Sequence, residues 1–147
     1  MKSIRVIHGA NLRLLGHREP ERYGTTTLAQ IDAALARRAE SLGVALVTEA
    51  TEHEGRIIEL LHECLLGPRK ADGVLLNAGA YAHTSLAIAD AVRSVAPVLV
   101  VEVHLTNTAA RASRPAVVGE ACLARVEGFG ARSYGVALEG LVAHLKG

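Results

Sequence analysis

The stretch Val98-Leu99-Val100-Val101-Glu102-Val103-His104 is a short run of apolar, mostly β-branched residues that closes on two polar side chains. A continuous apolar run of this length is typical of a strand that is buried on both faces, as the strands of parallel sheets are. The stretch therefore predicts a strand over residues 98–103. Because side chains alternate along a strand, Glu102 and His104 are expected to point to the same face at its end.

On either side of this strand, short β-branched runs alternate with longer segments of helical period. Strands are predicted at residues 3–8, 44–48, 74–77 and 122–126, and helices at residues 28–42, 54–66, 86–92 and 132–146. Thr27 is a candidate N-cap and Gly43 a candidate C-terminal glycine of the first helix, and Thr84 or Ser85 is a candidate cap of the third. This alternation predicts a parallel sheet with helices on both faces. We expect a flavodoxin-like, doubly wound α/β fold with five parallel strands in the order 2-1-3-4-5.

The composition indicates one globular domain over residues 1–147, because half of the 147 residues are hydrophobic and 21% are charged. Sixteen Lys and Arg stand against 15 Asp and Glu, and only 3% of the residues are aromatic, which argues against nucleic acid as a partner. The two cysteines, Cys64 and Cys122, lie far apart, as expected for free thiols in a reducing compartment. No apolar run has the length of a membrane span. We expect a cytoplasmic protein with no membrane partner.

The segment 9–26, between the first strand and the first helix, is long for a loop in a compact domain, which is typical of functional loops. Ligands of doubly wound sheets bind beyond the carboxyl ends of the strands, where this segment begins. Tyr23 follows Arg18 by five residues, and a nearby guanidinium favours the phenolate form of a tyrosine. Tyr23 is thus a candidate base, with a packed loop tyrosine as the alternative. His104 with Glu102 is a candidate acid, with a buried structural histidine as the alternative.

Other chemistries find little support in the sequence. No glycine-rich phosphate-binding motif stands between a strand and a helix, and Leu66 stands where a zinc motif beginning at His62 needs its second histidine. The lysines lie near the termini or in a polar turn, which disfavours imine chemistry; they are Lys2, Lys70 and Lys146. The remaining residues favour acid/base catalysis by tyrosine, histidine and carboxylates, with no metal and no cofactor.

Four blocks of the chain carry a family likeness. They are HGANL (8–12) with LG (15–16), REP (18–20) and YG (23–24); residues 52–62; NAGAYAHTS (77–85) through Asp90; and EVHLTN (102–107) with Arg111. In order and spacing these blocks resemble the type II 3-dehydroquinate dehydratases over most of the chain, and GFG (128–130) with Tyr134 is in keeping with them. The resemblance implies reversible dehydration of 3-dehydroquinate to 3-dehydroshikimate through an enolate, without metal or cofactor.

The resemblance also implies roles for individual residues. Tyr23 matches the base that removes a proton next to the ketone, and His104 matches the acid that protonates the leaving hydroxyl. Glu102 would orient or charge His104, while Asn11 would help to hold a water on the enolate oxygen. Arg18 would tune Tyr23.

Further residues match positions that bind the substrate or join subunits. Asn77 and His83 match contacts to substrate hydroxyls, and Leu105 and Thr106 match the pair that binds the carboxylate. Asp90 matches a residue that reaches the site of a neighbouring subunit. The family assembles as trimers packed into a dodecamer, so the resemblance implies a homo-oligomer of this kind.

The sequence departs from the family pattern in two places. His8 and Ala10 stand where the family has Asn and Pro. The segment that follows Arg111 is about two residues shorter, so Arg114 takes the place of the second family arginine only if a one-residue gap is allowed. On one helical turn Arg111 and Arg114 would share a face, and Pro115 would end that turn. The alternative is that Arg114 is solvated.

These observations favour an active dehydratase. The altered segment 111–119 motivates one alternative, a catalytically impaired homologue that binds a quinate-like ligand or has a regulatory role. A flavodoxin-type or receiver-type signalling domain is a third possibility, but an acidic cluster is missing after the first strand. The sequence leaves open whether the reaction serves aromatic amino-acid biosynthesis in the shikimate pathway or quinate catabolism.

Overall fold

The computed structural model describes residues 1–147 and contains one sheet of five parallel strands. The strands are β1 (Ser3–His8), β2 (Ala45–Ala50), β3 (Gly73–Asn77), β4 (Leu99–His104) and β5 (Ala124–Glu127). They lie in the order β2-β1-β3-β4-β5, and every neighbouring pair is parallel. The prediction of a flavodoxin-like, doubly wound sheet with this strand order is confirmed.

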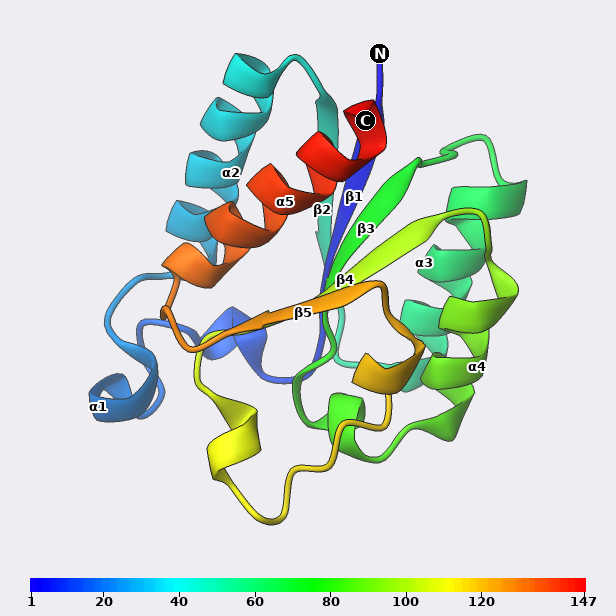
Figure 1. The fold of residues 1–147 in the computed structure, drawn as a ribbon. Coiled ribbons are helices and arrows are strands. Elements are labelled where there is room, and N and C mark those ends of the chain that lie inside the picture. The colour runs from blue at the N-terminus through cyan, green and yellow to red at the C-terminus, as the bar shows by residue number, and fades with distance from the viewer.

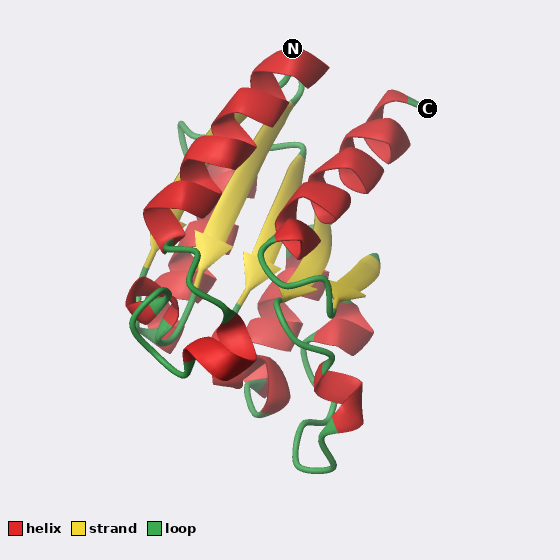
Figure 2. Cartoon of the chain, turned by 90° about the vertical axis from the view of Figure 1, so that its left-hand side faces the viewer, coloured by secondary structure: helices red, strands yellow, loops and turns green.

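Helices cover both faces of the sheet (Figure 1). The helices α2 (Leu28–Leu42) and α5 (Arg132–Lys146) pack side by side on one face, and Figure 2 looks onto that face. The helices α3 (Glu54–Leu66) and α4 (Leu86–Ser94) cover the other face. This arrangement gives the molecule two hydrophobic cores, one on each side of the sheet.

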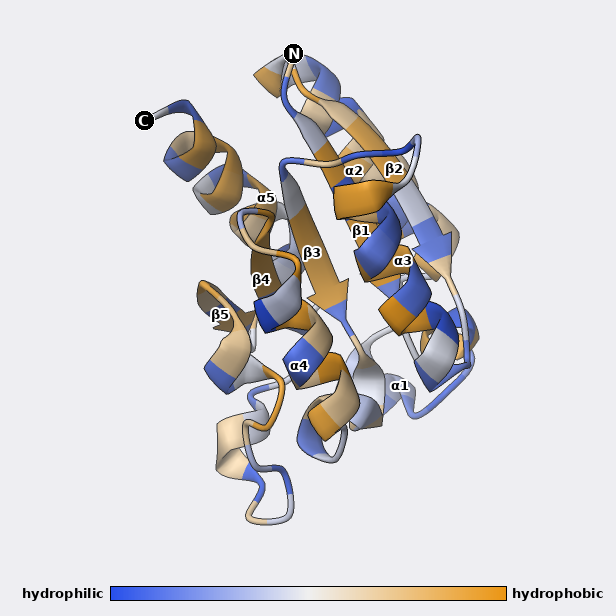
Figure 3. Ribbon diagram, turned by 90° about the vertical axis from the view of Figure 1, so that its right-hand side faces the viewer, coloured by the Kyte–Doolittle hydropathy of each residue, from blue (hydrophilic) through white to orange (hydrophobic).

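The alternation of side chains along the strands divides the apolar residues between the two cores. On β4, Val101 and Val103 face the core beneath α2 and α5, whereas Val100 faces the core beneath α3 and α4. Strand β3 is apolar for the same reason, and Figure 3 shows it in orange along most of its length. An apolar strand of this kind forms only where both of its faces are covered.

The ends of the helices follow the expected capping chemistry. The Thr27 hydroxyl accepts a hydrogen bond from the backbone N–H of Gln30, and the Gln30 side chain accepts one from the N–H of Thr27, which completes a capping box before α2. Gly43 ends α2 with a φ of 70°. Of the two candidate caps of α4, Ser85 is the one that accepts from the N–H of Ile88.

All the predicted strands except the first, and helix α4, differ from the structure by one or two residues at their ends. The last strand begins at Ala124 and not at Cys122, because the Cys122 N–H closes a turn on the Gly119 carbonyl. Strand β4 begins one residue late for a similar reason, since the Val98 N–H closes a turn on Val95. Segment 9–26 is not without regular structure: it contains a 3₁₀ turn (Leu12–Leu14) and the short helix α1 (Pro20–Tyr23).

Both ends of the chain lie at the edge of the sheet where the strands begin (Figure 1). Helix α5 runs back along the sheet, and the Lys146 ammonium donates a hydrogen bond to the Leu42 carbonyl at the end of α2. None of the helices has the length and apolar character that crossing a lipid bilayer requires. The carboxyl ends of the strands lie at the other edge of the sheet, where the loops form a pocket.

Candidate active site

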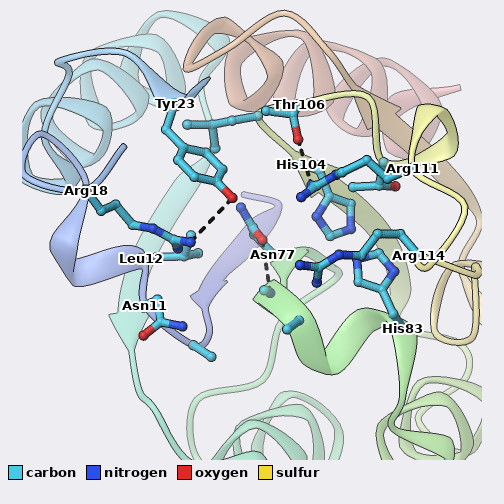
Figure 4. A pocket seen from close by; sticks show the side chains of 15 residues that line it. Asn11, Leu12, Arg18, Tyr23, Asn77, His83, His104, Thr106, Arg111 and Arg114 are labelled. Atoms are coloured by element: carbon cyan, nitrogen blue, oxygen red, sulfur yellow. Dashed lines mark hydrogen bonds between the residues drawn. The ribbon is translucent and has the colours of Figure 1, made fainter. Parts of the chain in front are cut away.

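A pocket at the carboxyl ends of β1, β3 and β4 collects most of the predicted site residues (Figure 4). Loop 9–26 and the loop after β4 form its walls. It is lined by Ala10, Asn11, Leu12, Arg18, Tyr23, Asn77, Gly79, Ala80, His83, His104, Leu105, Thr106, Thr108, Arg111 and Arg114. Ten of the twelve predicted site residues are in this lining, and Glu102 lies directly behind His104. Asp90 is the exception.

Tyr23 and Arg18 approach one another across α1. The Arg18 Nη2 donates to the Tyr23 hydroxyl over 3.4 Å, and the guanidinium carbon lies 4.4 Å from the centre of the Tyr23 ring. Helix α1 turns Tyr23 back toward Arg18, since Pro20 begins the helix and Gly24 ends it with a φ of 80°. The Arg18 guanidinium thus lies against both the hydroxyl and the ring of Tyr23.

His104 and Glu102 form the predicted pair on one face of β4. The His104 Nε2 lies 3.2 Å from the Glu102 Oε1, as an ion pair that is not aligned for a hydrogen bond. Burial by itself raises the pKa of Glu102, but the contact with His104 and the charge of Arg125 outweigh it and hold that pKa below its usual value. Glu102 is therefore a carboxylate, and its Oε1 faces the His104 ring.

His83 stacks on His104, with ring centres 5.6 Å apart and an angle of 23° between the rings. Its Nδ1–H donates to the Pro115 carbonyl over 2.9 Å. Burial lowers the pKa of His83, and the carbonyl of Pro115 only partly opposes this, while the charges of His104 and Arg114 add to the lowering. A neutral His83 with its proton on Nδ1 has Nε2 free to accept a hydrogen bond from a hydroxyl group.

Asn77 is fixed by a chain of buried polar groups that the sequence did not suggest. Its Nδ2 donates to the Tyr134 hydroxyl over 3.1 Å, and its Oδ1 accepts from the Gly79 N–H over 3.1 Å. The Tyr134 oxygen in turn lies 2.9 Å from the His8 Nδ1, and the His8 Nε2 lies 2.8 Å from an Asp32 oxygen.

The Asp32 end of this chain sets the direction of the first bond. A carboxylate only accepts, so the His8 Nε2 carries a proton toward Asp32, and in the tautomer with its only proton on Nε2 the Nδ1 accepts from the Tyr134 hydroxyl. The Tyr134 oxygen then accepts from Asn77, which leaves the second N–H of the Asn77 amide for the pocket. The signal in the sequence was His8, a polar residue that ends a strand directly after the apolar pair Val6 and Ile7.

The first turn of loop 9–26 is held close to two other segments. Asn11 has a φ of 68°, and its backbone N–H donates to the Glu52 Oε1 over 2.8 Å, while Arg13 donates to the Ala50 carbonyl. Gly79, with a φ of 64°, allows a close approach, because a Cβ there would lie 2.6 Å from the Ala10 carbonyl oxygen. These contacts aim the Asn11 side chain into the pocket.

Arg111 and Arg114 both reach the pocket, on the side of His83 (Figure 4). The Arg111 Nη2 donates to the Thr106 hydroxyl over 3.0 Å. The Arg114 N–H closes a single turn on the Arg111 carbonyl over 3.1 Å, so the expected shared face is formed by one turn and not by a helix. The expectation that Pro115 ends this turn is met, and Arg114 is not simply solvated.

Asp90 lies on α4, away from this pocket. Its side chain is 79% exposed and pairs with Arg93 over 3.7 Å. Its predicted part in a neighbouring subunit's site stays a prediction. The structure also brings no three His, Cys, Asp or Glu side chains together as a set of metal ligands.

Comparisons with known proteins agree with the fold. The family model described as dehydroquinase class II matches residues 2–142. A 3-dehydroquinate dehydratase of a Nostoc species is 45% identical over 99% of this chain and 97% of its own, and one of Ruegeria pomeroyi is 44% identical over 99% and 96%.

Two solved structures have the same fold. The type II dehydroquinase of Butyrivibrio crossotus superposes with a TM-score of 0.90 at 32% identity, over 95% of this chain and 97% of that one. The type II dehydroquinase of Propionibacterium acnes does so with a TM-score of 0.88 at 34% identity, over 97% of each chain. The chain belongs to the class II dehydroquinase family, the type II 3-dehydroquinate dehydratases, which are hydro-lyases.

Proposed function

We propose that this chain catalyses the reversible dehydration of 3-dehydroquinate to 3-dehydroshikimate, with Tyr23 as the base and His104 as the acid. One observation carries the proposal: a tyrosine beside a guanidinium and a histidine beside a carboxylate face the same pocket from different sides (Figure 4). A base and an acid at separate points are what the removal of water from two neighbouring carbons requires.

The reaction divides into two proton transfers. The Tyr23 phenolate takes a proton from the carbon next to the ketone, and the electron pair of that C–H bond forms an enolate. The enolate then returns its electrons to form the C=C bond as the C–O bond of the neighbouring hydroxyl breaks, and protonated His104 gives its proton to the departing hydroxyl oxygen, which leaves as water. Return of the proton from Tyr23 to His104 through solvent resets the pair.

The other pocket residues are proposed to bind and orient the substrate. Asn77 and His83 offer a donor and an acceptor to its hydroxyl groups. Leu105 and Thr106 at the end of β4, with Arg111 and Arg114, are proposed to bind its carboxylate. Asn11 would hold a water on the enolate oxygen, and Arg18 would stabilise the Tyr23 phenolate. Segment 9–26 is then an active-site loop.

Replacing Tyr23 by Phe tests the base directly. The ring and its packing stay, and only the ionisable oxygen is lost, so kcat is expected to fall by about 10²–10⁴-fold. The readout is the ultraviolet absorbance of the conjugated enone of 3-dehydroshikimate. Arg22→Lys, on the exposed side of α1, is a control that keeps the parent rate. If Tyr23→Phe kept kcat within about threefold of the parent, the assignment of Tyr23 would be wrong.

An assay of the unmodified protein distinguishes an active enzyme from an impaired homologue. The active enzyme forms the enone, whereas the impaired homologue would bind the substrate without forming it. We also expect activity to survive a chelator and, in the presence of substrate, borohydride. No lysine lines the pocket, so no imine is available for borohydride to reduce. Inactivation together with a covalent adduct would overturn the enolate route.

We propose further that the protein works as a homo-oligomer of trimers packed into a dodecamer, in a reducing compartment such as the cytoplasm, where the free thiols of Cys64 and Cys122 persist. The exposed Asp90 is the residue proposed to reach a neighbouring subunit. Asp90→Ala is expected to lower turnover even though Asp90 lies outside the pocket of its own chain. An active monomer in light scattering at the assay concentration would defeat this proposal.

A further inference from the structure

We propose that Arg125 is a positioning residue for catalysis: its ion pair with Glu102, sealed by Gly119, keeps that carboxylate ionised and aimed at His104. The inference rests on the proposed function in one respect, because it takes His104 as the acid. Arg125 does not line the pocket and would not touch the substrate.

The sheet places four side chains in a square on one face. Strands β4 and β5 pair with Glu102 beside Arg125 and His104 beside Glu127. The Glu102 carboxylate uses one oxygen for each neighbour: the Arg125 Nε donates to Oε2 over 2.7 Å, and the His104 Nε2 lies 3.2 Å from Oε1. A carboxylate held at one oxygen by a fixed donor presents its other oxygen in a fixed direction.

Arg125 is itself held at its far end. Its Nη2 donates to the Thr108 hydroxyl over 3.1 Å and to the Glu127 Oε1 over 3.0 Å, and the Thr108 hydroxyl also contacts Glu127. The planar guanidinium thus spans the two carboxylates of the square and cannot rotate away from Glu102 without breaking both bonds. A fixed arginine of this kind is a rigid support for Glu102.

Gly119 covers the ion pair from a second element. A Cβ at this position would lie 2.5 Å from the Glu102 Oε2 and 2.7 Å from the Arg125 Nε. Gly119 is buried, and it opens the 3₁₀ turn (Gly119–Ala121) that packs against α4. The absence of a side chain there lets the backbone lie against the pair and keep water from the Glu102 carboxylate, which is 1% exposed, and this strengthens the attraction between the two charges.

The charges of the square explain why Arg125 matters for His104. Two carboxylates, Glu102 and Glu127, face one arginine, and a protonated His104 completes a neutral set. The other titratable groups around Glu102 are His83, stacked on His104, and the Cys122 thiol. Without Arg125, the buried Glu102 and the partly buried Glu127 would share one cation, and Glu102 would take up a proton at a higher pH. A neutral Glu102 no longer supports a protonated His104.

Two kinds of variant separate charge from position. Arg125→Met removes the cation, so kcat is expected to fall by about tenfold or more, with a much smaller change in KM. The acid limb of the pH–kcat profile, where Glu102 becomes protonated, is expected to move to higher pH. Arg125→Lys keeps the positive charge but loses the planar guanidinium that bonds Glu102 and Glu127 at once. Its acid limb is therefore expected to stay near that of the parent, and its kcat to lie between those of Arg125→Met and the parent. Gly119→Ala adds no charge and displaces the carboxylate, so it lowers kcat without moving the acid limb.

The control is Arg38→Met, which breaks the ion pair of Arg38 with Glu139 between α2 and α5, far from Glu102. It is expected to keep the parent's kcat and acid limb. Thermal unfolding of each variant checks that it is folded. A folded Arg125→Met variant with the parent's kcat and acid limb would show that Arg125 only supports the edge of the sheet.

A readout that does not depend on turnover keeps the two proposals apart. The carboxyl carbon of Glu102, followed by NMR on ¹³C-labelled protein, is expected to titrate at a higher pH in Arg125→Met than in the parent. A parent that forms no enone would sink the proposed function and leave this titration valid. If the parent is active but Glu102 titrates at the same pH in the parent and in Arg125→Met, the inference about Arg125 is overturned and the proposed function stands.

Discussion

Arg111 and Arg114 stand three residues apart and reach the same pocket, but their surroundings differ. Arg111 is held by the Thr106 hydroxyl, next to the residues proposed to bind the substrate carboxylate. Arg114 lies near enough to His83 for its charge to help lower the pKa of that histidine. Arg111 is therefore fixed in one orientation, whereas Arg114 is a charge at the side of the pocket.

This difference predicts different kinetic effects for the two arginines. Arg111→Ala is expected to impair turnover strongly, because a fixed guanidinium aligns the substrate with the base and the acid. Arg114→Ala is expected mainly to raise KM, which indicates a loss of binding common to substrate and transition state. Initial rates over a range of substrate concentrations decide between these outcomes. If Arg114→Ala had the same kcat and KM as the parent, the second family arginine would have no functional counterpart here.

Pairs of residues close in the sequence were predictable, and pairs joined only by the fold were not. Tyr23 with Arg18 lies within one loop, and Glu102 with His104 follows from the two-residue period of a strand. Arg125 lies on the neighbouring strand, and the predicted start of that strand at Cys122 gave no register between the two. Sequence spacing says nothing about which residues of two separate strands stand side by side.

At the level of elements, a polar chain ties α5 and α2 to the end of the sheet. Tyr134 of α5 links His8 of β1 to Asn77 of β3, and Asp32 of α2 ends the chain. Burial raises the pKa of Tyr134, so its hydroxyl stays neutral and both gives and accepts a hydrogen bond. These hydrogen-bonded polar groups couple the packing of the two helices to the orientation of the Asn77 amide.

Tyr134→Phe tests this coupling. The ring still fills the core, but the His8 Nδ1 and the Asn77 Nδ2 lose their partner, which is expected to cost about 1–3 kcal/mol of unfolding free energy. Because the Asn77 amide is then free to turn, KM for the substrate is expected to rise as well. Urea unfolding and initial rates measure the two effects.

Tyr81→Phe is the matched control, because the Tyr81 hydroxyl donates to the Glu52 carbonyl over 2.9 Å at a partly exposed position. Tyr81→Phe also removes a tyrosine hydroxyl, but at a partly exposed position. Its loss of unfolding free energy is therefore expected to be smaller than that of Tyr134→Phe. Equal losses in the two variants would argue against the importance of the buried chain.

The boundaries of the helices were better predicted than those of the strands. Capping is local: Thr27 with Gln30 and the glycine at position 43 decide the two ends of α2 within a few residues. The ends of β4 and β5 depend on which backbone groups close neighbouring turns, as the Val98 and Cys122 N–H groups do. Packing along the whole edge of the sheet decides which of these turns close, and the local sequence pattern does not predict it.

For the whole molecule, the strand order followed from the alternation of apolar runs and helices, since few arrangements bury every strand on both faces. That the thiols of the buried Cys64 and the partly buried Cys122 would make stability depend on pH was not visible in the sequence. Burial raises the pKa of Cys64, and it raises that of Cys122 to about 12 from an ordinary value of 9.0. The folded protein thus keeps protons that the unfolded chain releases.

The sign of the effect follows from this difference. Below about pH 9 both states hold the Cys122 proton, and between about pH 9 and pH 12 only the folded state does, so the unfolding free energy falls as pH rises. The slope is up to about 1.4 kcal/mol per pH unit for each thiol. Urea unfolding between about pH 8 and pH 10, on either side of the ordinary pKa of a thiol, measures this slope. Cys122→Ala is expected to flatten the curve, and an unchanged slope would contradict the assignment.

The two ends of the chain lie at the edge of the sheet farthest from the pocket, with the Lys146 side chain bound to the end of α2. A linker fused to either end would leave the molecule on the side away from the mouth of the pocket. The protein could therefore be anchored to a resin, an electrode or a neighbouring enzyme by its first or last residue with the mouth facing the surrounding liquid. Immobilised in this way, it should turn over substrate as the free protein does.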